Sequence, residues 1–143
     1  WIPNIQVFKE KNYSFSNVKT VSPQELNKYP RIALIKSESS PSIYYLTKQG
    51  IKHHIPNVKV FKSYNNAFTD VLTVSDAELN SYKHSTLIRQ QGSSKIYLLN
   101  PSNNTIRWIP SISIFKKHSY SFNDVVVINS TEMRVYNEAE DVE

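Results

Sequence analysis

Three glutamates, Glu25, Glu78 and Glu132, recur at matching positions and offer the clearest capacity for acid–base chemistry. A positioned carboxylate can act as a general acid or base. Each one, however, stands three residues after a Ser or Asn, which is the spacing of a helix capping box. The three boxes are Ser22-Pro23-Gln24-Glu25, Ser75-Asp76-Ala77-Glu78 and Asn129-Ser130-Thr131-Glu132. Because capping accounts for all three carboxylates, we predict that they are structural and not catalytic.

The adjacent pair His53-His54 is the strongest candidate for metal binding. Neighbouring residues on a strand point to opposite faces, so these two rings cannot ligate one ion together. Cysteine is absent, which excludes disulfides, thiolate metal sites and cysteine nucleophiles. We therefore expect neither a metal nor a cofactor.

Glycine occurs only at Gly50 and Gly92. This scarcity excludes the glycine-rich phosphate loop, the dinucleotide-binding fingerprint and the nucleophile elbow, each of which needs two or more glycines at close spacing. We expect that the protein is not an enzyme.

A candidate ligand surface combines recurring aromatic and basic residues. Amphipathic aromatic rings stack on sugar rings or bases, and the lysines follow an inward-facing Phe and should point outward. The residues are Trp1, His54, Trp108, Lys9, Lys62 and Lys116. In the simpler interpretation, which we favour from the sequence, Trp covers the edge of the core and Lys solubilises it.

The spacing of these residues reflects an internal repeat of about 53 residues. Aligned from Trp1 and from His54, two stretches share 16 identities in 31 ungapped positions, where chance gives about two. We divide the chain into a first segment, 1–31, which lacks its hairpin, a second segment, 32–85, and a third segment, 86–143, with an acidic tail. Because the chain starts within a repeat, we expect it to be part of a longer protein.

Each segment contains the same sequence signals. Runs at 43–47 and 51–55, and again at 96–100 and 106–109, flank Gly- or Asn-containing turns and predict hairpins. A further strand is expected at Leu34-Ile35 and at Leu87-Ile88. A Pro then ends the hairpin, and a short helix follows, capped by Asn4, Asn57 or Ser111.

The rest of each segment should supply a strand, at 18–21 or 71–74, and the short helix of the capping box, which ends near Tyr29, Tyr82 or Tyr136. We predict one buried set, namely Phe8, Phe15, Phe61, Phe68, Phe115, Phe122, Leu26, Leu79 and Met133. The fold class is therefore α+β, as tandem repeats of hairpin, short helix, strand and short capped helix. The sequence leaves an open array and a propeller-like closure undecided.

The net charge is +5, yet residues 138–143 carry four acids and no base, so the rest of the chain carries +9. Such a body attracts polyanions. No apolar run approaches the roughly 18 residues of a membrane span.

Ile96-Tyr97-Leu98-Leu99, Arg107-Trp108-Ile109-Pro110 and Asp124-Val125-Val126-Val127 together form a pattern. It resembles the tandem repeats of bacterial secreted and cell-surface proteins. The resemblance implies an exported, non-catalytic accessory module. The chain departs from the pattern at His53-His54, where Arg-Trp is expected.

From these observations we expect an extracellular or cell-surface binding or structural module. Three alternatives stay open: a module that binds cell-wall glycan for a larger enzyme, a self-assembling filament or surface-layer unit, and a nucleic-acid binder that uses the basic body. The corresponding partners are wall polysaccharide or another polyanion, further copies of the chain, and nucleic acid.

Overall fold

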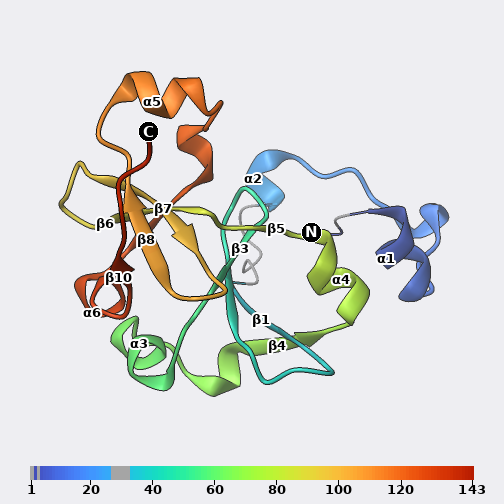
Figure 1. Cartoon of the computed structure of the whole chain (residues 1–143). Coiled ribbons are helices and arrows are strands. Elements are labelled where there is room, and N and C mark those ends of the chain that lie inside the picture. The colour runs from blue at the N-terminus through green and yellow to red at the C-terminus, as the bar shows by residue number, and fades with distance from the viewer. Residues whose placement is uncertain (1, 3, 27–32) are drawn as a thin grey trace.

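The computed structural model describes the chain except for residues 1, 3 and 27–32 (Figure 1). It contains two five-stranded sheets with short helices around them, and neither sheet closes into a barrel within the described part of the chain. The mixed α and β content agrees with the predicted α+β class. Across the described residues, no helix is both long and apolar enough to cross a bilayer.

The first sheet lies entirely within the second segment. Its strands are β1 (Leu34–Ser37), β2 (Tyr44–Leu46), β3 (Ile51–His54), β4 (Val71–Val74) and β5 (Lys83–His84). Strands β1, β2 and β3 form an antiparallel meander, while β4 joins β1 and β5 joins β3 in parallel. The order is β4-β1-β2-β3-β5.

The second sheet lies within the third segment and is built in the same way. Its strands are β6 (Leu87–Gln90), β7 (Ile96–Asn100), β8 (Thr105–Trp108), β9 (Val125–Ile128) and β10 (Asn137–Glu138). The order β10-β8-β7-β6-β9 repeats the first sheet, with β9 parallel to β6 and β10 parallel to β8.

Both predicted hairpins and both preceding strands are confirmed. The turns use the residues expected of them, because Gly50 and Asn104 adopt positive φ angles of 76° and 54°. The two-residue strands β5 and β10 were not predicted. They are polar and too short for an alternating pattern, and only their parallel partners define them.

Two series of short helices follow the strands. The first comprises α1 (Ile5–Glu10), α3 (Val58–Ser63) and α5 (Ile112–Lys117), and the predicted caps Asn4, Asn57 and Ser111 each accept a backbone N–H. The second comprises α2 (Pro23–Leu26), α4 (Asp76–Ser81) and α6 (Ser130–Met133). A turn of 3₁₀ helix lies between them at η1 (Phe15–Asn17), η2 (Phe68–Asp70) and η3 (Phe122–Asp124).

The predicted buried set is correct only in part. Phe8, Phe61, Phe115 and Leu79 are buried, and Met133 packs at the edge of a core cluster. The side chain of Leu26, like all of Tyr29, lies outside the described residues.

The prediction is wrong for Phe15, Phe68 and Phe122, which are 70%, 56% and 60% exposed. Their 3₁₀ turns place them on the surface, where each ring covers the buried Phe of the preceding helix.

The predicted strand at 18–21 is also absent, since these residues have no regular structure. The equivalent strands β4 and β9 exist by pairing with β1 and β6. Among the described residues, no strand pairs with 18–21 in this way.

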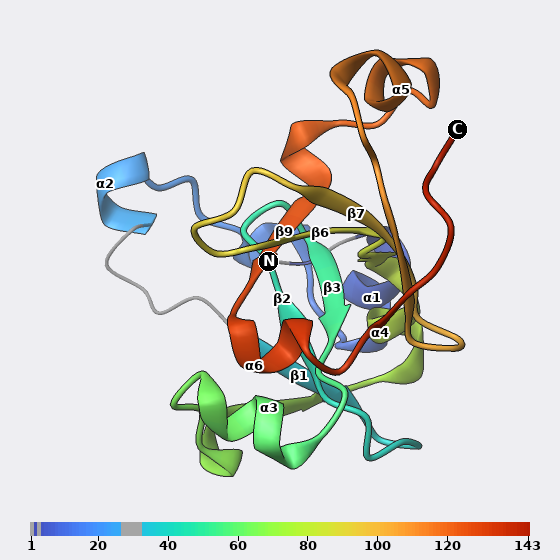
Figure 2. The same cartoon turned by 60° about the vertical axis from the view of Figure 1, so that its left-hand side comes forward.

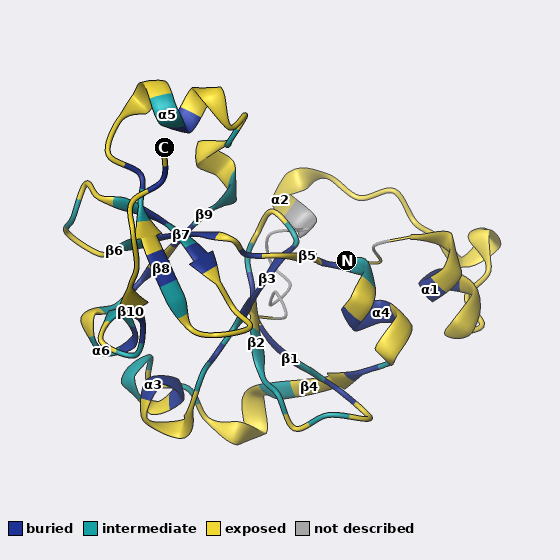
Figure 3. Cartoon of the chain, viewed as in Figure 1, coloured by how far each residue is buried: buried dark blue, intermediate teal, exposed yellow. Residues whose placement is uncertain are grey.

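Helices of successive segments pack in pairs, α1 against α4 and α3 against α6 (Figures 1 and 2). The apolar clusters also cross between segments, because Ile51 of β3 joins the core of the second sheet and Val135 packs against the cluster around Phe61. Figure 3 shows the buried residues concentrated along the strands and on the inner faces of α3 and α4.

Only Ser85 and Thr86 connect the two sheets. Ser85 is buried, and its N–H donates to the Lys52 carbonyl of the first sheet at 2.9 Å. The carbonyl of Thr86 accepts from the Leu99 N–H of the second sheet at 2.8 Å. The connection is therefore bonded to the sheet on either side.

Candidate functional site

A stacked pair of phenylalanines, one buried and one exposed, recurs in all three segments, and we call each pair an aromatic ledge. The outer ring of each pair belongs to a 3₁₀ turn and lies nearly parallel to the inner ring. The pairs are Phe8–Phe15, Phe61–Phe68 and Phe115–Phe122, with centroid distances of 4.5, 4.5 and 4.4 Å. One face of each outer ring packs on its partner, and much of the ring stays exposed to solvent.

The ledge of the third segment borders a pocket of about 270 Å³. Phe122, Trp108 and the exposed Ile112 line it. Lys95 also lines it, with Nζ 4.6 Å from the centroid of the Trp108 ring. This arrangement offers apolar faces together with a cation, which suits a ligand that has both C–H surfaces and negative charge.

The structure separates the residues of the predicted ligand surface. Trp108 is half-buried in this pocket, whereas Trp1 lies outside the described residues. His54 is half-buried beside Tyr44, with a ring-centroid distance of 5.4 Å. The exposed lysines of the prediction are Lys9, Lys62 and Lys116.

Lys116 does not line the pocket of Trp108, and Lys95 takes that place. Burial first, and then the charge of His53, lowers the pKa of His54, although Glu132 opposes the shift. His54 is therefore neutral near pH 7 and adds no charge to a ligand surface.

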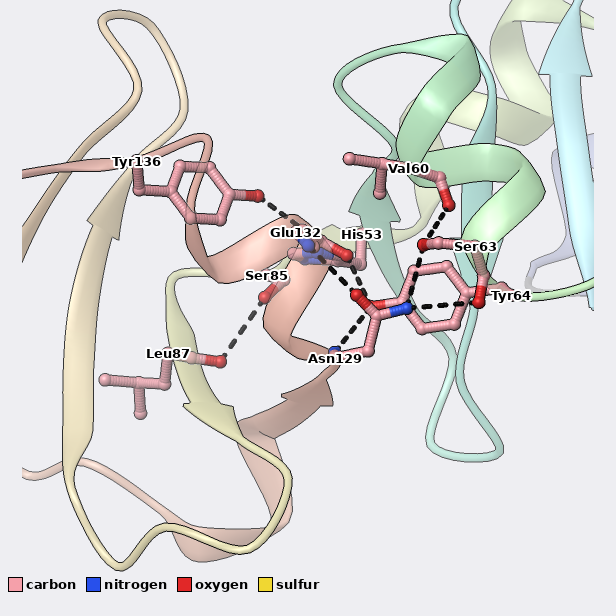
Figure 4. A network of polar contacts seen from close by, with 9 residues as sticks. All are labelled: His53, Val60, Ser63, Tyr64, Ser85, Leu87, Asn129, Glu132 and Tyr136. Carbon is pink, nitrogen blue, oxygen red and sulfur yellow. Dashed lines mark hydrogen bonds and ion pairs between the residues drawn. The ribbon is translucent and has the colours of Figure 1, made fainter.

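A second arrangement, missed from the sequence, surrounds the buried carboxylate of Glu132 on α6 (Figure 4). His53 Nε2 lies 2.5 Å from Oε1, and the Tyr136 hydroxyl donates to Oε1 at 2.8 Å. Tyr64, which follows α3, donates its hydroxyl hydrogen to Oε2 at 2.6 Å. The second segment thus supplies two of the three partners.

These partners keep Glu132 ionised. Burial alone would raise the pKa of its carboxyl group, but the hydrogen bond and charge of His53, with the two tyrosine hydroxyls, hold that pKa below its usual value. In return, burial and the carboxylate raise the pKa of both Tyr64 and Tyr136 well above the ordinary range.

The capping-box interpretation of Glu132 is corrected by these contacts. The side chain of Asn129 does cap the helix, since it accepts the Glu132 N–H at 2.9 Å. The carboxylate does not return to the cap, because the Asn129 N–H donates instead to the Tyr64 hydroxyl at 2.9 Å. Because the Tyr64 hydroxyl accepts the Asn129 N–H, the Glu132 carboxylate is available to bind His53 and Tyr64 of the second segment.

Glu78 forms the matching joint between the first and second segments. Its carboxylate is buried, with Lys11 Nζ 3.2 Å from Oε2 in an ion pair that lacks hydrogen-bond geometry. Lys11 stands at the position of Tyr64 in the repeat, and Tyr82, at the position of Tyr136, donates to Oε1 at 3.4 Å. The predicted capping box here also holds only at Ser75, which accepts the Glu78 N–H.

Beside Glu132, a pocket of about 260 Å³ lies between the second and third segments. Tyr45, Tyr64 and Val127 contribute to its lining. Both oxygens of Glu132 already accept hydrogen bonds, so the carboxylate holds the segments together and is not free as a base. Within the described ranges, no three His, Asp or Glu side chains gather as a metal site requires.

Comparison with known proteins identified no relative of this chain. No family model matches the chain, and neither a curated protein nor a solved structure is similar to it.

Proposed function

We propose that the chain is a non-catalytic tandem-repeat module of the bacterial cell surface that binds wall polysaccharide along its aromatic ledges. The carrying observation is that each of three segments has one exposed phenylalanine ring stacked on a buried one. Exposed aromatic surface at a recurring place favours an interaction site over a by-product of packing. The resemblance of the sequence to repeats of secreted bacterial proteins supports the location.

The matching sheets and the matching joints at Glu78 and Glu132 support a repeat array. An array sets its ledges at fixed spacings, and a polymer of repeating units can then contact several of them at once. Several weak contacts on one polymer raise the overall affinity well beyond that of a single ledge.

Sugar is a better match to the ledges than nucleic acid. Apolar faces such as Phe122 and Ile112 stack on the C–H faces of sugar rings, and Lys95 can meet an anionic group beside them. The +9 body adds a long-range attraction for anionic wall polymers. Nucleic acid remains the alternative, and its binding should weaken steeply with salt, whereas stacking on neutral sugar should not.

Titration with purified wall polysaccharide tests the proposal. Phe15→Ala, Phe68→Ala and Phe122→Ala should each weaken binding by roughly 2- to 10-fold, as expected for one aromatic contact of about 0.5–1.5 kcal/mol. The triple variant should lose binding. Leu72→Ala is the matched control, because Leu72 is an exposed apolar residue of β4 that belongs to no ledge. Unchanged affinity of a folded triple variant would refute the proposal, as would any turnover that a point mutation abolishes.

A further inference from the structure

The pocket beside Glu132 is built by side chains from two segments. The second segment supplies Tyr45 of β2 and Tyr64 at the end of α3, and the third segment supplies Val127 of β9. Its volume of about 260 Å³ exceeds the roughly 150 Å³ that suffices for a benzene ring in a protein interior. Tyr45 and Val127 are 42% and 48% exposed, so they lie at its opening. The pocket therefore has room for one substituted ring, and a ligand can reach it from solvent.

Most of the lining cannot form hydrogen bonds. The aliphatic side chains of the lining are those of Ile55, Val126, Val127 and Ile128. The two tyrosines add aromatic rings, which favour stacked or edge-on contact with another ring. A sugar carries hydroxyl groups on most of its carbons, and this lining would leave several of them unpaired, which is unfavourable on burial. The lining thus favours a ring that is mainly apolar.

One polar atom of the lining residues lacks a partner. His53 lines the pocket and is only 3% exposed. Its Nε2 contacts the Glu132 carboxylate, whereas Nδ1 is buried without a hydrogen-bond partner among the described residues (Figure 4). Because an ionised carboxylate only accepts, Nε2 carries the hydrogen of that contact, and Nδ1 accepts in the neutral ring and donates in the protonated ring. A hydroxyl group can be its partner in either state.

The charge at the pocket is already paired, which disfavours an ionic ligand. Glu132 is fully buried, and its two oxygens accept hydrogen bonds from one histidine and two tyrosines. This carboxylate would repel an anion, and a cation would have to replace one of the three donors in order to reach it. A neutral ligand avoids both costs.

We propose that this pocket binds a small, neutral aromatic ring that bears a hydroxyl group, such as a substituted phenol, with the ring against Tyr45 and Val127 and the hydroxyl group at Nδ1 of His53. None of the six ledge phenylalanines lines the pocket, so the site is separate from the ledges. A ligand there contacts two segments at once. Binding should therefore stabilise their joint, because a ligand that binds only the folded chain opposes unfolding.

Titration of the full chain with para-cresol, followed by proton–nitrogen correlation NMR, tests the proposal. The backbone amide signals of Asn66, Val126 and Val127 should shift and saturate. In para-xylene a methyl group replaces the hydroxyl group, so it should bind about 3- to 10-fold more weakly, as expected for the loss of one hydrogen bond. The charged analogues para-toluate and para-methylbenzylamine should bind more weakly than para-cresol.

Two tryptophan variants locate the site. Val127→Trp fills the opening from an exposed position of β9 and should abolish the saturable shifts. Thr73→Trp is the matched control, because Thr73 of β4 has the same register in the first sheet, is exposed and does not line the pocket. It should bind para-cresol like the native chain. If Val127→Trp does not fold, Tyr45→Ala removes an aromatic wall and should weaken binding by roughly 2- to 10-fold.

Three outcomes would count against the site. A chain that shows no saturable shift up to the solubility limit of para-cresol would overturn the proposal. Undiminished binding by a folded Val127→Trp chain, or by Tyr45→Ala in its place, would locate the ligand elsewhere and would also overturn it. Equal affinities for para-cresol and para-xylene would overturn the assignment of the hydroxyl group to His53.

Discussion

The hydroxyl group of Tyr64 donates a 2.6 Å hydrogen bond to Oε2 of Glu132, across 68 positions of sequence. Lys11 makes the equivalent contact with Glu78 one segment earlier. The same position thus holds a neutral donor at one joint and a cation at the other, while the acid is unchanged. The buried acid is the constant part of the joint.

Replacing this acid should be costly. Glu132→Ala leaves His53, Tyr64 and Tyr136 without their shared acceptor, and loss of one partner from a buried ionic network costs about 3–5 kcal/mol. Denaturant unfolding followed by circular dichroism measures the loss. Glu140→Ala, at an exposed residue, should change the free energy of unfolding by less than about 0.5 kcal/mol. Equal effects of the two substitutions would contradict a structural role for Glu132.

Acid should destabilise the fold through Glu132. The pKa of its carboxyl group is lower in the folded chain than the value of about 4.3 expected on unfolding. The stabilisation is therefore complete above about pH 4.3 and is lost as the pH falls from there through the folded pKa. Unfolding free energies measured between pH 7 and strongly acidic solution should fall less steeply for Glu132→Gln than for the native chain.

Alkali should destabilise the fold through the buried tyrosines. Burial, with the charge and hydrogen bond of Glu78, raises the pKa of Tyr82 to about 12. A group whose pKa is raised on folding stabilises the fold below its unfolded value, here about 10, and loses that contribution as the pH rises toward 12. Tyrosinate absorbance during alkaline titration should show a late phase that Tyr82→Phe reduces but does not abolish, because the pKa values of Tyr64 and Tyr136 are raised as well. A titration identical to that of the native chain would show that Tyr82 does not contribute.

The two rings of a ledge should differ in their contribution to stability. Phe61 is 2% exposed, so Phe61→Ala should cost about 3–5 kcal/mol. Phe68 is 56% exposed and contacts the core chiefly through the stack, so Phe68→Ala should cost about 0.5–1.5 kcal/mol. Thermal and denaturant unfolding of both variants, beside the native chain, measures the difference. A larger loss of stability for Phe68→Ala than for Phe61→Ala would mean that Phe68 is the ring that contributes more to the core.

Local signals in the sequence were sufficient for the hairpins and the helix caps. Gly50 and Asn104 permit their turns, and Asn57 caps α3, through contacts between near neighbours in the chain. Such contacts need no knowledge of the tertiary fold, which is why the sequence pattern predicts them.

The local sequence signals did not predict the contacts between segments. Glu132 has the spacing of a capping box, and only the approach of Tyr64 and His53 shows that its carboxylate turns away from the cap. Phe68 recurs like a core residue, yet its 3₁₀ turn leaves it on the surface. Recurrence marks a position that every segment uses, and does not distinguish burial from display.

The connection between the two sheets consists of two residues and contains no flexible linker. Ser85 is bonded to Lys52 and Thr86 to Leu99, so each residue of the connection is fixed to its own sheet, while Ile51 and the partners of Glu132 hold the two segments against each other. A tension applied along the chain reaches the second sheet through two residues that have no free length to extend. The two sheets should therefore move as one rigid unit under load, and not as two independent units joined by a flexible linker.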